Sequence, residues 1–223
     1  MISKINKISE GYYLLEVANL ECERDDRMLF ADLSFSVMPG ETLQVEGCNG
    51  SGKTTLLKIL AGLTQDYQGT VLWGKDLLNK NYAEFRLACH FIGHYPGIKN
   101  ELSPMENLTW RQSISGRKLS NNFTDALAEA DLAGYEYIPC GSLSAGQQRR
   151  VALAGLLVSD ARLWILDEPF TAIDSSGIDW VERLLEQHAR QGGMTVITSH
   201  QALSESLAGL RTIRLDQYSG IQV

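Results

Sequence analysis

The stretch GCNGSGKTT, residues 47–55, decides how the rest of the chain is interpreted. It fits the pattern G-x-x-x-x-G-K-[ST] and lies between a strand-like segment (42–47) and a helix-like segment (54–63), which is the context that the pattern requires. Its glycines let successive N–H groups point at phosphate oxygens, and the helix that follows adds its positive end. A plain glycine-rich turn is the alternative, but it leaves Lys53 and Thr54 at the helix start unexplained. The stretch therefore predicts a phosphate-binding loop.

Each residue of this loop is a candidate contact for a nucleotide. Lys53 is expected to neutralise the β and γ phosphates, Thr54 to bind Mg²⁺ through its hydroxyl, and Thr55 to contact the α-phosphate. Cys48 lies close to a helix N-terminus, a position that can lower the pKa of a thiol, although we do not expect it to act as a nucleophile. The predicted nucleotide-binding residues here are Gly47, Cys48, Asn49, Gly50, Ser51, Gly52, Lys53, Thr54 and Thr55.

The second motif is acidic and lies at the end of an apolar segment, RLWILDEP (162–169). The apolar run is typical of a central parallel strand buried on both faces, and open α/β sheets bind ligands at the carboxyl ends of such strands. Asp167 is the expected Mg²⁺ partner. Glu168 is the expected general base, polarising a water for attack on a γ-phosphate. A polar way to end a strand is the alternative, and the phosphate-binding loop upstream favours the catalytic interpretation.

Composition limits the class of protein. With 223 residues, 44% hydrophobic and 21% charged, the chain fits one sizeable globular domain. A net charge of −7 argues against a protein that binds nucleic acid by charge, and the four cysteines form no CxxC pair, as expected of reduced thiols in the cytoplasm. Residues 1–13 have no apolar core, so no signal peptide is expected. The longest apolar run, 151–158, is too short for a membrane span, so another chain would supply any membrane part.

Strand-like and helix-like segments alternate along the chain, which predicts an α/β fold with a mainly parallel sheet. LLEVANL (14–20) and LSFSV (33–37) are expected as early strands, and TVITSH (195–200) as a late one. Between about 98 and 160 the pattern is helical, with one of the expected helices over 122–135. We therefore expect a helical insert between two parts of one sheet.

The segment LSAGQQRRVALAGLL (143–157) has two interpretations. Ser144 and Gln147 have the spacing of a helix capping box, with an apolar core-facing stripe after it. That interpretation leaves Gly146 unexplained, because glycine in a first helical turn costs up to about 1 kcal/mol relative to alanine. A backbone that approaches a phosphate closely does explain it, and the helix start would then offer Ser144 and unpaired N–H groups to a γ-phosphate.

The order of these motifs resembles that of the ATP-binding-cassette (ABC) ATPases, over nearly the whole chain. The phosphate-binding loop is followed by LSAGQ (143–147), LWILDE (163–168), FTAID (170–174) and His200 after a strand. The resemblance implies a P-loop ABC ATPase core with N-terminal antiparallel strands and an inserted helical subdomain. It implies one domain, 1–223, with a nucleotide-binding core over 1–94 and 161–223 and a helical subdomain over 95–160.

The resemblance also implies a head-to-tail homodimer that forms with ATP and Mg²⁺. Ser144, Gly146 and Gln147 would act on the ATP of the other subunit across the interface, and Asp174 would link the two sites. His200 would contact the γ-phosphate and hold the attacking water.

Two positions depart from the family pattern. His94, in FIGHYPGIK (91–99), stands where most members carry a glutamine that reaches Mg²⁺ and water from a mobile loop. Mg²⁺ prefers oxygen ligands, so we expect His94 to hydrogen-bond water, phosphate or Glu168 instead; a loop histidine without nucleotide contact is the alternative. Arg24 stands where the family usually has an aromatic residue that stacks on adenine.

Further details (GHYPGIK, LSAGQQRRVALA and a late QGGMTVITSHQ) are similar to the ATPase subunits of the haem exporter of cytochrome c maturation. This similarity implies integral membrane partners, CcmB- and CcmC-like, and a peripheral position on the cytoplasmic face of the inner membrane. No direct haem site and no nucleic-acid partner are expected. The ATPase of another exporter, a P-loop small-molecule kinase and a nucleotide-gated assembly module are the alternatives. LSAGQ argues against the kinase, and Glu168 with His200 argues against a module that barely hydrolyses ATP.

Overall fold

The computed structural model describes residues 14–115, 122–204, 206–207 and 209–219. The expectation that residues 1–13 contain no signal peptide concerns a segment outside these ranges. In the described ranges, no helix combines the length and the apolar character that a membrane crossing needs.

The strands form two sheets. The antiparallel sheet has the order β2-β1-β4-β5, with Leu15 of β1 opposite Val37 on one side and Trp73 on the other. The parallel sheet has the order β6-β7-β8-β3-β9. The antiparallel strands are β1 (Leu15–Arg24), β2 (Arg27–Val37), β4 (Gln68–Trp73) and β5 (Asp76–Leu77), and the parallel strands are β3 (Thr42–Glu46), β6 (Cys89–Ile92), β7 (Leu163–Asp167), β8 (Met194–Thr198) and β9 (Leu210–Arg214). The predicted α/β class, with antiparallel strands before a parallel sheet, is confirmed.

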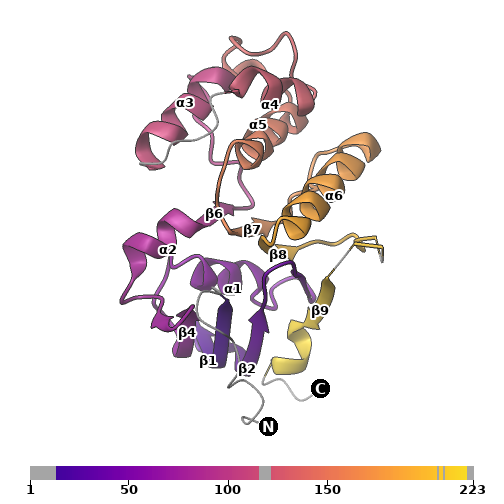
Figure 1. Cartoon of the computed structure of the whole chain (residues 1–223). Helices are drawn as coiled ribbons and strands as arrows, with labels where there is room; N and C mark the ends of the chain where they lie inside the picture. Colours follow the sequence, from indigo (N-terminus) through magenta and orange to yellow (C-terminus); the bar gives the residue numbers. More distant parts are fainter. Residues whose placement is uncertain (1–13, 116–121, 205, 208, 220–223) are drawn as a thin grey trace.

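The helices divide into those that flank the sheets and those that stand apart from them. Figure 1 shows α3, α4 and α5 grouped at one end of the molecule, beyond the strands, whereas α1 lies among the strands. The helices are α1 (Lys53–Leu60), α2 (Tyr82–Ala88), α3 (Pro104–Ser115), α4 (Phe123–Glu129), α5 (Ala145–Leu157) and α6 (Ser175–Arg190), with short 3₁₀ turns η1 (Cys140–Ser142) and η2 (Leu215–Tyr218).

The helix expected over 122–135 is shorter than predicted, because α4 ends at Glu129. Asp131 has a positive φ of 59°, and the Leu132 N–H donates to the Leu127 carbonyl at 2.8 Å. This left-handed turn satisfies the last carbonyls of the helix and stops it, although the alanine-rich sequence favours a longer one.

Strand β7 lies inside the parallel sheet between β6 and β8, and each of its five residues is buried. Trp164 and Leu166 pack in one apolar cluster with residues of α5 and α6, whereas Leu163 and Ile165 pack in another with α1 and β1. Both faces are therefore covered, as the apolar run in the sequence predicts. The strand that carries Asp167 at its end is therefore packed between two apolar clusters.

A neutral histidine lies at the base of this core. The His188 ring, on α6, stacks on Trp164 with centroids 3.8 Å apart and an interplanar angle of 4°, and its Nε2 lies 3.3 Å from the Met194 carbonyl. Burial lowers the pKa of His188 from about 6.5 to about 4. The unfolded chain therefore binds the extra proton between these two values, and stability is lost as the pH falls through that window.

Replacement of the imidazole by a ring that cannot titrate tests this. We expect His188→Phe to keep the stack on Trp164 and to remove the part of the acid sensitivity that His188 contributes. Between about pH 7.5 and about pH 5, the wild-type free energy of unfolding should fall by about 2 kcal/mol more than that of the variant. Urea unfolding at the two pH values measures the difference, and equal losses would contradict it.

Candidate nucleotide site

The loop 47–52 curls around the ammonium group of Lys53. The Nζ atom of Lys53 donates to the carbonyls of Gly47 at 2.6 Å and Cys48 at 3.2 Å. Gly52 precedes α1 with a φ of 98°, and a Cβ there would lie 3.1 Å from the Leu29 side chain. The position therefore requires glycine for its backbone angle and for its close neighbour. The result is a curled loop at a helix N-terminus, as predicted from the sequence.

A pocket of about 300 Å³ joins this loop to the carboxyl ends of the parallel strands. We call it the phosphate pocket. Its residues come from the loop, from the end of β7 and from the segments after β6 and β8, so residues far apart in the sequence meet there. They are Asn49, Gly50, Gly52, Lys53, Thr54, His94, Asp167, Glu168 and His200.

Asp167 is held by one of its two carboxylate oxygens. Its side chain is buried, and the Thr198 hydroxyl donates to Oδ1 at 2.8 Å. The other oxygen, Oδ2, is buried and has no hydrogen-bond partner in the described structure. A buried carboxylate oxygen without a partner is costly unless a ligand occupies it. Thr54 lines the same pocket, so this donor set fits a Mg²⁺ ion bound by a carboxylate and a hydroxyl.

Glu168 is fixed through its main chain. It has a positive φ of 51°, and its N–H donates to the hydroxyl of Thr198 at 3.0 Å. Its carboxylate faces His200: Oε2 accepts from the His200 N–H at 3.2 Å, and Oε1 lies 3.5 Å from the imidazole Nε2. The carboxylate is 14% exposed and the imidazole 62%, so both can reach a molecule in the pocket.

His94 lies on the wall of the phosphate pocket and is exposed. Its ring meets Tyr95 edge to face at a centroid distance of 5.4 Å. Arg24 does not line the pocket; its guanidinium is exposed and lies 3.8 Å from Asp25.

The position of Cys48 near a helix N-terminus does not lower the pKa of its thiol. Its pKa is raised, not lowered, because the thiol shares a hydrogen bond with the carboxylate of Asp216, and the negative charge disfavours a thiolate. The Cys48 N–H also donates to Asp216 Oδ1 at 3.1 Å. This carboxylate comes from η2, distant in the sequence, and its effect is larger than the lowering effect of Lys53.

The predicted residues Ser144, Gly146, Gln147 and Asp174, which we call the signature set, do not line the phosphate pocket of their own chain. Ser144 caps α5: its hydroxyl accepts from the Gln147 N–H at 3.2 Å, and Gln147 Oε1 accepts from the Ser144 N–H at 3.0 Å. The capping box is therefore present.

Gly146 and Asp174 contact the rest of the chain. A Cβ on Gly146 would lie 2.5 Å from the Ala172 carbonyl, so close packing inside the chain also requires glycine there. Asp174 caps α6 and pairs with Arg150 at 2.7 Å. The pKa of Asp174 is lowered, first by the hydrogen bond from Ser176 and also by Arg150.

Sequence reasoning missed three residues that support the site: Thr198, Asp216 and Arg149. Thr198 and Asp216 are ordinary polar residues in the sequence, and only the fold brings them to Asp167 and to the loop. Arg149 is one of two adjacent arginines that resemble an exposed pair, yet it is 2% exposed because α5 is buried continuously from Arg149 to Leu156.

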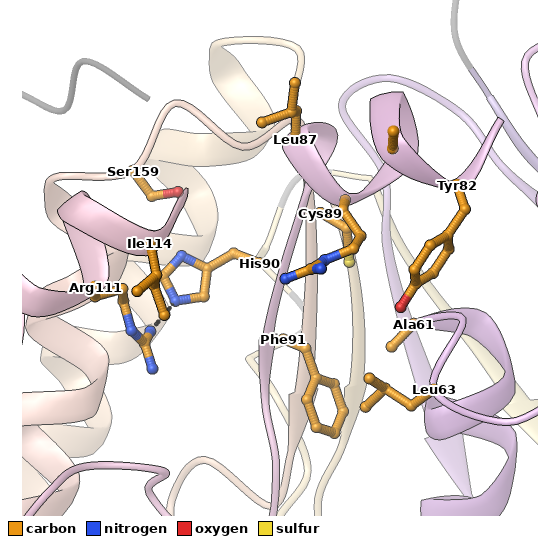
Figure 2. Close-up of a pocket in the computed structure, with 12 residues that line it drawn as sticks. Ala61, Leu63, Tyr82, Leu87, Cys89, His90, Phe91, Arg111, Ile114 and Ser159 are labelled. Atoms are coloured by element: carbon orange, nitrogen blue, oxygen red, sulfur yellow. Dashed lines mark hydrogen bonds between the residues drawn. The ribbon is translucent and has the colours of Figure 1, made fainter. Parts of the chain in front are cut away.

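A larger hollow of about 540 Å³ lies between α2, β6 and α3 (Figure 2). Leu63, Leu87 and Ile114 are exposed apolar side chains around it. Arg86 and Arg111 also line it, whereas no acidic residue does, and Arg111 contacts His90 as the dashed line shows. Its lining contains no part of the loop 47–52 and no carboxylate, so it lacks the groups that the sequence predicts for phosphate and Mg²⁺ binding.

Comparisons with known proteins agree with this geometry. Residues 30–171 match the family described as ABC transporter. A cytochrome c biogenesis ATP-binding export protein CcmA from Yersinia pseudotuberculosis is 50% identical over 91% of this chain and 93% of its own length. CcmA proteins from Aliivibrio fischeri (47% identity, 92% of this chain and 100% of the relative) and Escherichia coli O157:H7 (48%, 92% and 97%) are similar.

Solved structures share the fold. An ABC transporter ATP-binding protein from Pyrococcus furiosus superposes with a TM-score of 0.80 and 26% identity, covering 92% of this chain and 99% of the other. An ATP-binding cassette solved as a dimer bound to ADP and Pi has a TM-score of 0.76 and 20% identity, with 90% and 94% covered. The second likeness, at its low identity, concerns the fold alone.

Proposed function

The chain belongs to the ABC transporter family, as an ATP-binding ATPase coupled to export, and we propose that it drives the export step of cytochrome c biogenesis, with haem as the cargo. The observation that carries the proposal is the phosphate pocket, where Lys53, Asp167 and Glu168 line one hollow of about 300 Å³. Relatives at about half identity are named for that process. The ATPase of a different exporter is the remaining alternative.

In the proposed reaction, the phosphates lie against the N–H groups of the loop 47–52, with the ammonium group of Lys53 released from the carbonyls that it now contacts. Mg²⁺, held by Thr54 and Asp167, would neutralise phosphate charge when bound. Glu168 accepts a proton from the attacking water, and His200 contacts the γ-phosphate. The contact between Glu168 and His200 keeps the base and its neighbour aligned. His94 reaches the same pocket from the loop after β6, where we assign it to the water or the γ-phosphate.

The signature set supports a homodimer that forms with ATP. Ser144, Gly146 and Gln147 start a helix that offers N–H groups, yet they do not line their own chain's pocket. A second copy arranged head to tail would bring them to the γ-phosphate. Asp174, which pairs with Arg150 of α5, would then link the two sites.

We also propose that the chain divides into a nucleotide-binding core (1–94 and 161–223) and a helical subdomain (95–160).

We assign the hollow between α2 and α3 to an integral membrane partner, CcmB- or CcmC-like, at the cytoplasmic face of the inner membrane. Exposed apolar side chains around a concave surface mark interaction sites. The hollow contains two guanidinium groups and no carboxylate, so the contacting segment would be apolar with an acidic group. Strand β6 lines the hollow and leads into His94, which connects this surface to the phosphate pocket.

A haem stain for c-type cytochromes in cells that lack this gene tests the function. Wild type should restore the cytochromes, and Lys53→Ala should not, because the β and γ phosphates lose their cation. Lys58→Ala, on the exposed side of the same helix, is the matched control and should restore them. Cytochromes that persist without the gene would overturn the proposed cargo and leave the ATPase of another exporter.

The same strain tests the assignment of the hollow. Ile114→Lys adds a third positive charge beside Arg111 and removes an apolar contact. We expect cytochromes to be lost or strongly reduced, with the variant still present in the cell by immunoblot. Full restoration by Ile114→Lys would contradict the assignment.

Light scattering of the purified chain tests the dimer. Glu168→Gln removes the general base but keeps the shape of the side chain, so ATP should remain bound and hold two copies together. We expect the mass to double in this variant when Mg²⁺ and ATP are added, and to stay that of a monomer when Lys53→Ala is combined with it. A Glu168→Gln variant that binds ATP yet stays monomeric would count against the homodimer.

A further inference from the structure

A single buried guanidinium joins α5 to two of the segments that line the phosphate pocket, the one after β6 and the one at the end of β7. The side chain of Arg149 is 2% exposed, and all its hydrogen-bond partners in the described structure are main-chain carbonyls. Nη1 donates to Gly93 at 2.8 Å and His94 at 3.4 Å. Nη2 donates to Asp167 at 2.8 Å and Glu168 at 2.7 Å, and Nε donates to Pro169 at 3.2 Å.

This arrangement is specific to arginine. Removing a cation from water costs several kcal/mol, so it is stable inside a protein only when its hydrogens are satisfied. The planar fork of a guanidinium can serve two groups of carbonyls at once, whereas lysine is a point donor on a flexible stem. Burial lowers the pKa of Arg149 to about 10, while the nearby carboxylates of Asp167 and Glu168 raise it, so the group stays charged near neutral pH.

The carbonyls that Arg149 binds belong to two segments. One contains Glu168, whose backbone is strained, and the other follows β6, outside the sheet hydrogen bonds. Glu168 has a φ of 51°, a left-handed conformation that costs a residue with a side chain roughly 1–2 kcal/mol. Its carbonyl is held by Arg149 and its N–H by Thr198, so the peptide groups on both sides of its Cα are fixed. Gly93 and His94 follow β6 where the sheet hydrogen bonds have ended. One side chain therefore sets the spacing between the base and the loop that carries His94.

The same side chain belongs to the helix that begins with the signature set. Arg149 is five residues after Ser144, about 7.5 Å along the helix axis. A displacement of the start of α5 would thus reach the carbonyls of Glu168 and His94 through one helix and one side chain. Such a displacement is what contact with the other subunit's γ-phosphate would produce.

We propose that Arg149 is a positioning residue: through the five carbonyls, it aligns Glu168 and His94 with each other and transmits movement of α5 to them. The proposal rests on the proposed ATPase function, because the aligned groups are those assigned to the hydrolysis of ATP. Arg149 itself does not touch the reacting atoms.

Steady-state hydrolysis of Mg-ATP by the full chain is the first test. We expect Arg149→Gln to lower kcat by about 10- to 100-fold while the Kd for ATP changes by less than about threefold, since misplacement of reacting groups by about 1 Å costs this much without removing the phosphate-binding loop. Arg149→Lys should retain an intermediate kcat. Gln148→Ala is the matched control. Gln148 precedes Arg149 in α5 and donates two hydrogen bonds to main-chain carbonyls, those of Cys140 and Leu143, but it does not line the pocket.

The imidazole resonances of the chain's four histidines give a second readout that needs no turnover. Without nucleotide, Arg149→Gln should shift the signals of His94 and His200 and leave that of His188, on the far side of the core, in place. Gln148→Ala should leave His94 and His200 unshifted.

The two readouts separate the possible failures. Wild-type hydrolysis no faster than that of Glu168→Gln would refute the ATPase function, and the imidazole shifts would still decide the role of Arg149. A kcat unchanged in folded Arg149→Gln, or a parallel loss of kcat and ATP affinity with unshifted His94 and His200, would overturn the positioning role.

Discussion

The carboxyl end of β7 is the constraint on which the rest of the structure depends. Two carboxylates must stand side by side there, at the edge of a sheet whose interior excludes water. Asp167 and Glu168 are stable in this position because Thr198 donates to one, β8 and His200 hold the other, and two apolar clusters fix the strand before them. The curled loop contributes the opposite charge, that of Lys53, to the same pocket. Most of the fold is the support for this one arrangement of charge.

Much of this could be predicted from the sequence, because the signals are local. The loop 47–55 contains its glycines, its lysine and its hydroxyls in one continuous stretch, and the apolar run before Asp167 specifies a buried strand by itself. The early strands and the start of α5 are likewise specified by local signals, for α5 the capping-box spacing of Ser144 and Gln147. The neighbours of the site could not be predicted, since they depend on which segments meet. Arg149 is the clearest case: its charge indicates the surface, whereas the helix packing buries it against five carbonyls. The raised pKa of the Cys48 thiol could not be predicted for the same reason, because Asp216 comes from the far end of the chain.

The two interpretations of the segment 143–157 turn out to be compatible. Ser144 and Gln147 form the capping box that a simple helix start requires, and Gly146 has a packing reason in the Ala172 carbonyl. Both observations are compatible with the proposed contact between the helix start and a phosphate. A helix that is already capped is rigid before any ligand arrives, so less conformational entropy is lost when the ligand binds.

The cap on α5 also restricts which substitutions at position 144 leave the helix start able to bind an anion. A serine hydroxyl accepts from the Gln147 N–H and still has a hydrogen of its own to donate. Aspartate is as good an N-cap, yet its negative charge would repel a phosphate. Aspartate at position 144 would thus preserve the fold while making the helix start repellent to anions. In this chain one hydroxyl, that of Ser144, caps the helix and is the proposed donor to an anion. The two properties are separable, so a variant can be folded and well capped and still fail to bind its ligand.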